Sequence, residues 1–242
     1  MTLLDPADLG TILSVWAHPD DETYLAAGIM AAARDQQRRV VCAVASAGEL
    51  GTEDPAGWPP ERLGPVRRWE AAAAMAVLGV DEHHILGLPD GGLAGHESQG
   101  LAWVRGLLDD VRPDTILTFG PEGMTFHDDH VAVHRWVTTV WQERDRSCRL
   151  LYATTTVEHI ESFRDLYESW GVFMTDQRPA GVPEESLAVL LRLDGVALDR
   201  KVAALRTMST QTEPVLASLG VDVYAALVRD EAYWSAARPD PE

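Results

Sequence analysis

Short apolar runs alternate with longer amphipathic segments along most of the chain. The runs have the length of strands and are bounded by turn residues, whereas the longer segments carry apolar residues at helical spacing. We expect strands near residues 11–17, 39–45, 83–87, 114–119 and 149–155. We expect helices near residues 22–36, 62–78, 100–111, 129–143 and 158–170. This βαβα order predicts a mostly parallel sheet with helices on both faces.

The C-terminal third adds a strand-like run from Ser186 to Leu193 and two helical patterns near 198–209 and 222–237. We expect these segments to complete the same domain, because 242 residues with 46% hydrophobic content suffice for one large α/β core. The expected fold class is therefore α/β and Rossmann-like, with a single domain over residues 1–242. Two long loops, Glu49–Gly64 and Gly91–Gly100, are expected to form walls or lids of a substrate site.

Composition narrows the class of protein without identifying it. A formal net charge of -18 argues against nucleic-acid binding, because phosphate contacts need clustered Lys and Arg. Two cysteines, Cys42 and Cys148, offer neither a disulfide framework nor a cysteine zinc site, which fits a reducing cytoplasm. The first ten residues lack the pattern of a signal peptide, and no window approaches the roughly 18 apolar residues of a membrane span. We therefore expect a cytoplasmic protein with no membrane contact.

The first cluster of reactive side chains follows the first predicted strand. In His18-Pro19-Asp20-Asp21-Glu22, one imidazole and three carboxylates occupy five residues. A parallel strand that ends in such a cluster delivers it to the carboxyl edge of the sheet, where open α/β folds bind ligands. The acids would repel a phosphate, so this is not a nucleotide-binding turn. The alternative is a purely structural turn whose acids begin a helix, but that does not explain His18.

The second cluster, His127-Asp128-Asp129-His130, follows the fourth predicted strand, and His134 lies one helical turn further on. Imidazole nitrogen and carboxylate oxygen are usual zinc ligands, and a catalytic zinc site has three protein ligands and one open position. His127 with His130, or His130 with His134, can share a helix face and bind a metal. The residues alone therefore leave the third ligand open.

In order along the chain, these motifs resemble the PIG-L/LmbE-like zinc-dependent N-deacetylases, the family that includes deacetylases of mycothiol and bacillithiol biosynthesis. Ala17-His18-Pro19-Asp20-Asp21-Glu22 is similar to its first signature, and His127-x-Asp129-His130 to its second. The intervening matches are Ser46-Ala47-Gly48-Glu49-Leu50-Gly51, Arg67-x-x-Glu70 and Leu88-Pro89-Asp90-Gly91. The resemblance runs from about residue 11 to 135 and continues weakly through Lys201 to Gln211.

The resemblance implies a role for each motif residue. It assigns zinc, or another divalent metal such as Fe²⁺, to His18, Asp21 and His130. Asp20 is then the general base, His127 stabilises the oxyanion, and Asp129 orients His127. His134 is expected beside the metal site rather than on the metal.

The resemblance also implies substrate contacts to a sugar through Glu49, Arg67 and Asp90. An acidic pair with one arginine suits hydrogen bonding to hydroxyl groups. The chain departs from the family at Thr125-Phe126, where some members have tyrosine, and at Met208, where histidine is frequent.

The expected function is a metal-dependent hydrolase that removes the N-acetyl group from an N-acetylglucosamine-containing small molecule and releases acetate and a free amine. One alternative is a zinc amidase that acts on a thiol conjugate or another N-acyl sugar. A second is a catalytically silent Rossmann-like binding protein, against which the retained polar motif positions argue. The resemblance further suggests a homo-oligomer, as a trimer or hexamer.

Overall fold

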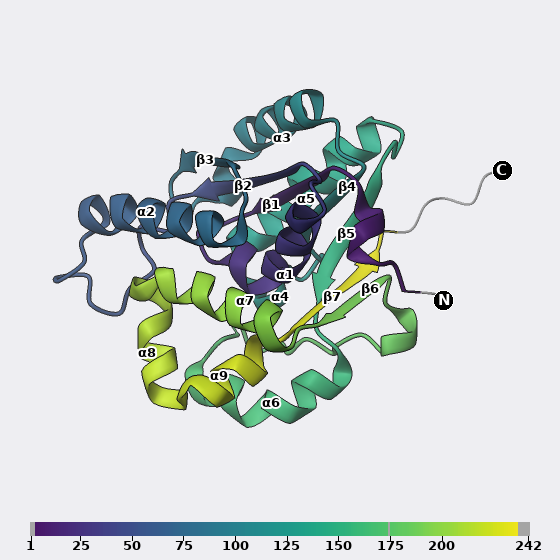
Figure 1. Cartoon of the computed structure of the whole chain (residues 1–242). Helices are drawn as coiled ribbons and strands as arrows, with labels where there is room; N and C mark the ends of the chain where they lie inside the picture. Colours follow the sequence, from purple (N-terminus) through teal and green to yellow (C-terminus); the bar gives the residue numbers. More distant parts are fainter. Residues whose placement is uncertain (1–2, 174, 237–242) are drawn as a thin grey trace.

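The chain folds around one twisted sheet (Figure 1), and the computed structural model describes residues 3–173 and 175–236. Within this part, seven strands are hydrogen-bonded in the order β3-β2-β1-β4-β5-β7-β6. All neighbouring pairs from β3 to β5 are parallel, and β7 runs antiparallel to both of its neighbours. The strands are β1 (Ile12–Trp16), β2 (Val40–Ser46), β3 (Glu82–Leu88), β4 (Thr115–Phe119), β5 (Arg149–Thr154), β6 (Val189–Arg192) and β7 (Asp230–Ser235).

Helices cover both faces of the sheet, which confirms the expected α/β class. Helices α1, α2 and α7 pack against one another, and α3 packs against α5. Two layers result, one on each side of the central strands, as right-handed crossovers between parallel strands require. The α-helices are α1 (Asp21–Asp35), α2 (Pro60–Leu78), α3 (Glu97–Val111), α4 (Gly123–Phe126), α5 (Asp128–Glu143), α6 (Val157–Trp170), α7 (Gly195–Thr207), α8 (Ser209–Leu219) and α9 (Val221–Val228). Three 3₁₀ helices are η1 (Pro6–Leu9), η2 (Leu93–His96) and η3 (Glu184–Ser186).

The C-terminal region departs from the sequence prediction. The helical pattern predicted over 222–237 is wrong in its second half: α9 ends at Val228, and β7 follows at once as a strand between β5 and β6. Residue 237 lies outside the described residues. The pattern near 198–209 corresponds to α7, and α8 was not predicted. The strand near 186–193 is confirmed as β6. The two expected loops are shorter than predicted, since α2 begins at Pro60 and η2 and α3 occupy 93–111.

A buried ion pair fixes α1 against the C-terminal elements. Lys201 on α7 and Glu231 on β7 are fully buried, with 2.8 Å between Nζ and Oε1. Lys201 also donates to the carbonyl of Tyr24, and Glu231 accepts from the N–H groups of Gly28 and Ile29. Because a buried charge needs a partner and full hydrogen bonding, this network specifies where α1 lies. It thereby sets the position of the first turn of α1, where the first polar cluster is found.

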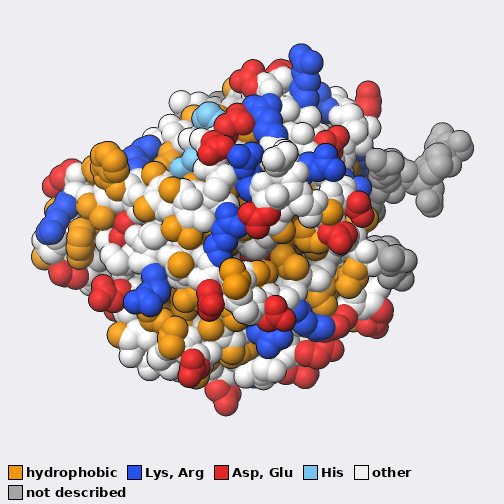
Figure 2. All heavy atoms as spheres, in the orientation of Figure 1, with side chains coloured by type: hydrophobic (Ala, Val, Ile, Leu, Met, Phe, Trp, Pro, Cys, Tyr) orange, Lys and Arg blue, Asp and Glu red, His pale blue; other side chains and the backbone are white. Residues whose placement is uncertain are grey.

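Acidic side chains and arginines are interspersed over the face of the molecule shown in Figure 2, without one dominant basic patch on that face. Several form exposed pairs, such as Arg105 with Glu143 at 2.9 Å. Exposed pairs of this kind stabilise a fold by only ~0–1 kcal/mol each. Among the described helices, none combines the length and apolar character that crossing a bilayer requires.

Candidate active site

The two polar clusters meet because β1 and β4 are adjacent in the sheet. Ser14 on β1 pairs with Leu117 on β4, so both strands end at the same edge. The chain leaves β1 into His18 and the first turn of α1, and leaves β4 through α4 into His127 and α5. The site therefore lies at the carboxyl edge of the parallel strands, as the sequence predicts.

Nitrogens of His18 and His130 face the Asp21 carboxylate, each nearest a different oxygen, and nitrogens of His18, His127 and His130 lie within 4.8 Å of one another. Nδ1 of His18 lies 3.2 Å from Nε2 of His130 and 3.6 Å from Oδ2 of Asp21. Nε2 of His130 lies 3.4 Å from Oδ1 of Asp21. Ligands at about 2.0–2.2 Å from a tetrahedral zinc are themselves roughly 3.3–3.6 Å apart. The donor set and its spacing thus fit a divalent metal, with His18, Asp21 and His130 largely buried.

The second nitrogen of each of these two imidazoles has a hydrogen-bond acceptor. Nε2 of His18 lies 3.1 Å from Oδ1 of Asp90 and 3.2 Å from Oδ2 of Asp129. Nδ1 of His130 lies 2.8 Å from the carbonyl of Gly123. A neutral ring with its proton on the outer nitrogen keeps a lone pair on the inner nitrogen, where it can bind a metal. Metal-binding histidines typically have such partners, which fix the tautomer and the ring orientation.

The surroundings of His18 and His130 shift the pKa values of the two rings in opposite directions. Burial works against the charged form of His18, but the hydrogen bonds that it donates to Asp129 and Asp90 outweigh burial and raise the pKa of His18 to about 10. Burial, reinforced by His18, lowers the pKa of His130 to about 3. In turn, burial of Asp90 is outweighed by its hydrogen bond with His18, which lowers the pKa of Asp90 to about 2. The cluster is therefore a site that holds one positive charge between carboxylates, as it would a cation.

Asp20 lies beside this group in an unusual backbone conformation, with φ 132° and ψ -35°. A positive φ is costly for a residue with a side chain and persists only where neighbours enforce it. Here the N–H of Asp20 donates to Glu22, and Arg67 donates to both the Asp20 carboxylate and the Pro19 carbonyl. Burial raises the pKa of Asp20 to about 6 against the opposing charge of Arg67. A carboxylate with that pKa is suited to accept a proton near neutral pH.

Arg67 is oriented differently from the expected sugar contact. Its side chain is buried, and it donates to the Gly48 carbonyl at 2.6 Å as well as to the Asp20 carboxylate at 3.0 Å. Gly48 has φ 64°, and a Cβ there would collide with the guanidinium. Sequence reasoning missed this role of Gly48, although a glycine directly before Glu49 is the signal for such a close approach. Arg67 thus positions Asp20.

Asp90 and Glu49 form a second support chain. Asp90 uses one oxygen on His18 and accepts the N–H of Leu50 with the other, at 2.8 Å. Glu49 accepts the N–H of Asp90 at 3.0 Å through Oε1, while its Oε2 is buried without a hydrogen-bond partner. Asp90 therefore holds a proposed metal ligand in place, and its expected contact with substrate stays a prediction. Glu49 retains a free acceptor, as a substrate contact requires.

Asp129 also has contacts other than the expected ones. Its carboxylate lies against His18 and accepts from Gly91 at 2.7 Å and Leu93 at 2.9 Å. Only its backbone N–H reaches His127, donating to Nδ1 at 3.1 Å. His127 is thereby the N-cap of α5, and a neutral ring carries its proton on Nε2. The His127 ring lies 4.9 Å from the His18 ring, centroid to centroid. It therefore borders the group formed by His18, Asp21 and His130, which we call the metal-facing group.

The remaining motif positions lie apart from the ligand atoms. Nδ1 of His134 lies 2.9 Å from the Phe119 carbonyl, and its ring contacts Tyr152, in agreement with a place beside the site. Met208, where the family often has histidine, is buried in the core at the end of α7. Thr125 lies next to Met124, which has the positive φ of 64°, and its hydroxyl is buried without a partner.

A parallel sheet with a buried histidine–aspartate cluster and an arginine-bound carboxylate at its carboxyl edge defines the chain as an α/β protein with a candidate metal-binding active site. The family model described as GlcNAc-PI de-N-acetylase, PIG-L, matches residues 13–141, more than half of the chain. The chain belongs to this family, which confirms the resemblance seen in its sequence.

Curated relatives and solved structures agree with that assignment. The chain is 35% identical to a 1D-myo-inositol 2-acetamido-2-deoxy-alpha-D-glucopyranoside deacetylase of Saccharomonospora viridis, an alignment that covers 60% of the chain and 62% of that relative. It is 31% identical to a probable N-acetyl-alpha-D-glucosaminyl L-malate deacetylase 2 of Bacillus subtilis, covering 93% of the chain and 96% of the relative. The fold matches the A40926 pseudoaglycone deacetylase with a TM-score of 0.70 at 21% identity, covering 97% of this chain and 100% of that one.

Proposed function

We propose that the protein is a metal-dependent N-deacetylase that hydrolyses the acetamide of an N-acetylglucosamine-containing small molecule to acetate and a free amine. The observation that carries this proposal is the convergence of ligand atoms from His18, Asp21 and His130 beside the arginine-bound Asp20. The two curated relatives named above are described as deacetylases of such conjugates. A catalytically silent binding protein would not need a carboxylate poised to accept protons.

The metal would be held by His18, Asp21 and His130, with zinc as the first candidate and Fe²⁺ as the alternative. When bound, a divalent ion polarises the acyl oxygen and acidifies the attacking water. The carboxylates around His18 favour its charged form, so His18 gives up a proton when a metal binds, whereas burial already keeps His130 neutral.

The chain's own residues supply the proton transfers and the charge stabilisation. Asp20 accepts a proton from the water that attacks the acyl carbon, and Arg67 keeps it ionised and oriented. His127 donates from Nε2 to the acyl oxygen as negative charge develops there. The C–N bond then breaks, and the departing amine takes a proton from Asp20 or His127. Glu49 offers its unpaired oxygen to a sugar hydroxyl.

The test combines metal analysis with amine release from N-acetylglucosamine conjugates, including the inositol and malate glycosides. We expect about one divalent ion per chain and metal-dependent formation of free amine and acetate in equal amounts. Restoring the metal-free protein with Zn²⁺ or Fe²⁺ identifies the active ion. A chain that binds metal yet releases no amine from any conjugate contradicts the proposal. A trimeric or hexameric assembly and a cytoplasmic location stay predictions.

A further inference from the structure

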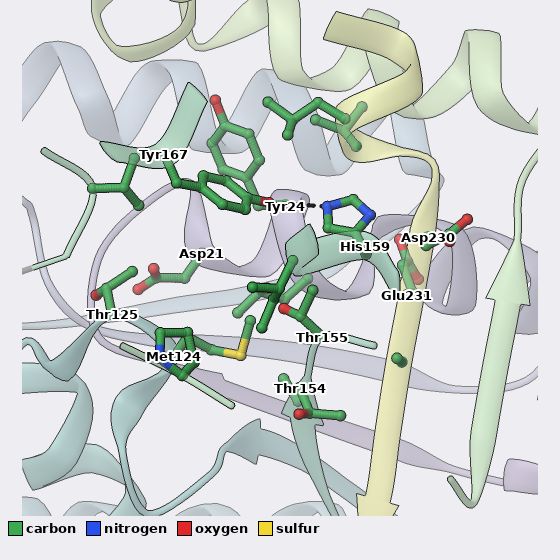
Figure 3. Close-up of a pocket in the computed structure, with 18 of the residues that line it drawn as sticks. Asp21, Tyr24, Met124, Thr125, Thr154, Thr155, His159, Tyr167, Asp230 and Glu231 are labelled. Carbon is green, nitrogen blue, oxygen red and sulfur yellow. Dashed lines mark hydrogen bonds between the residues drawn. The ribbon is translucent and has the colours of Figure 1, made fainter. Parts of the chain in front are cut away.

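A cavity of about 320 Å³ adjoins the group formed by His18, Asp21 and His130, and neither Asp20 nor Arg67 is among its lining residues. Asp21 lies at one side of its lining and the strand β7 at the other (Figure 3), and His130 is also among the lining residues. The cavity is at the lower end of the volumes typical of small-molecule sites. Even so, the cavity is much larger than the two-carbon acyl group of an acetamide requires.

The wall is mainly apolar and comes from elements on both sides of the sheet's antiparallel edge. Helices α6, α8 and α9 and the segment after α6 contribute the apolar side chains that line it. Among them are Ile160, Trp170, Phe173, Val215 and Leu227. A surface of this kind gains free energy when it excludes water, so an apolar group is its natural occupant.

Several polar side chains of the wall are paired within the protein, whereas Oδ1 of Asp230, at the β7 side, is buried without a hydrogen-bond partner. The hydroxyl of Tyr24 lies 2.9 Å from that of Tyr224, and the hydroxyl of Tyr167 lies 2.9 Å from Nε2 of His159. Glu231 is held by the buried ion pair with α7. Burial lowers the pKa of His159, so its ring is uncharged at neutral pH. A sugar placed between these paired groups would lose the hydration of its hydroxyls and gain few partners, which costs free energy.

The end beside the metal-facing group is different. There the buried hydroxyl of Thr125 has no hydrogen-bond partner and lines the cavity together with Asp21 (Figure 3). One polar group thus marks the point where the cavity meets the site of amide cleavage. Glu49, with its unpaired oxygen, does not line the cavity, so the sugar and the apolar group are assigned to different sides.

We propose that this cavity binds the hydrocarbon chain of an N-acyl group, so that the enzyme removes medium-length acyl groups from amino sugars more efficiently than acetyl. The proposal rests on the proposed function and extends its substrate class. The reaction is the same hydrolysis: water adds to the acyl carbon, the C–N bond breaks, and a carboxylic acid and a free amine are released. Each methylene buried in the cavity favours binding by about fourfold.

The decisive comparison uses the metal-loaded full chain with N-octanoylglucosamine, N-acetylglucosamine and the octyl glycoside of N-acetylglucosamine. We expect kcat/KM to be at least about tenfold higher for the octanoyl amide than for the acetyl amide, as burial of two or more methylenes predicts. Equal values for the two amides would overturn the proposal. So would a gain confined to the octyl glycoside, since the cavity would then bind the leaving group.

Two cavity-filling variants locate the effect. Ile160→Trp on α6 should remove the octanoyl advantage and leave hydrolysis of the acetyl amide within about threefold of wild type. Val215→Trp on α8 tests the same wall independently if the first variant fails to fold. Arg164→Trp places the same side chain on the exposed face of α6 and should change neither substrate. Retention of the octanoyl advantage in both folded cavity variants would overturn the assignment.

Calorimetric binding of octanoate and acetate separates this proposal from the proposed function. If no conjugate is hydrolysed but octanoate binds at least about tenfold more tightly than acetate, and Ile160→Trp abolishes the difference, the deacetylase function fails and the acyl-chain site stands. If octanoate and acetate bind equally, the site fails whatever the enzyme hydrolyses.

Discussion

Replacing Arg67 with methionine removes the positive charge that faces Asp20 while keeping an apolar side chain of similar length. The guanidinium donates to the Asp20 carboxylate at 3.0 Å and is buried from solvent. Two unit charges about 4 Å apart interact by about 4 kcal/mol at an effective dielectric constant of 20. That energy corresponds to roughly three pKa units. The Asp20 side chain is 21% exposed, so solvent screens part of the interaction, and we expect an upward shift of about one to two units.

The sign of this shift can be read from the pH profile of kcat/KM. Asp20 must be ionised to act as a base, so activity rises with pH through its pKa, which is about 6 in the wild-type protein. In Arg67→Met the acidic limb should move to about pH 7–8, and activity well above that pH should be partly retained. Metal content should stay unchanged, because Arg67 contacts the base and not the proposed ligands.

Two further variants make this measurement specific. Arg67→Lys keeps the charge but loses the forked geometry that also reaches Gly48, so its acidic limb should stay closer to pH 6 while its thermal stability falls. Arg68→Met removes the neighbouring exposed arginine from the same helix and should leave the profile in place. A folded, metal-loaded Arg67→Met enzyme with an unmoved acidic limb would refute the assignment of Asp20 as the base held by Arg67.

Three other predictions follow from the site and the sheet. His18→Ala should lose most of the bound metal, whereas His134→Ala should retain it, as elemental analysis of the purified variants will show. Asp20→Asn should keep the metal and lose roughly 10²–10⁴-fold in kcat, the usual effect of removing a general base. His83→Leu should reduce the loss of stability on acidification, because burial lowers the pKa of His83 from 6.5 to about 4. Denaturant unfolding between pH 7 and pH 4 measures that difference.

Each of these three predictions has a result that would contradict it. Equal metal loss from the His18 and His134 variants would favour a ligand pair on α5 instead. Loss of metal from Asp20→Asn would make that residue a ligand. For His83, the folded protein disfavours the protonated ring, so its contribution is complete above about pH 6.5 and declines as the pH falls toward 4. The shift corresponds to about 3 kcal/mol, and a pH dependence unchanged by His83→Leu would exclude it.

The sequence by itself determined the local parts of this protein. Apolar runs followed by amphipathic helices predicted where strands lie along the chain and that the sheet is mostly parallel, because burial on both faces and helical spacing are properties of short segments. The approach of His18 to Asp21 was also local, since three residues separate them and the backbone N–H of His18 donates to Asp21. The residue types of the two polar clusters therefore indicated a metal-binding site.

Only the tertiary structure decided which distant groups act together. His18 and His130 are 112 residues apart, and their nitrogens meet because β1 lies next to β4, a neighbour relation that hydrogen bonding across the sheet sets. Arg67 and Asp90 turn inward onto Asp20 and His18 because buried charges must find partners, and no local pattern says which partner is available.

The C-terminal segment shows the same limit most clearly. The helical pattern over 222–237 reflects the spacing of its apolar residues, yet 230–235 forms β7 because β5 offers an unpaired edge and Glu231 reaches the N–H groups of α1. Backbone hydrogen bonds in a helix are made within the segment, whereas those in a sheet depend on a neighbour far along the chain. The periodicity of a sequence indicates whether a segment can form a helix. Only the assembled fold shows whether a neighbouring strand is available to pair with it.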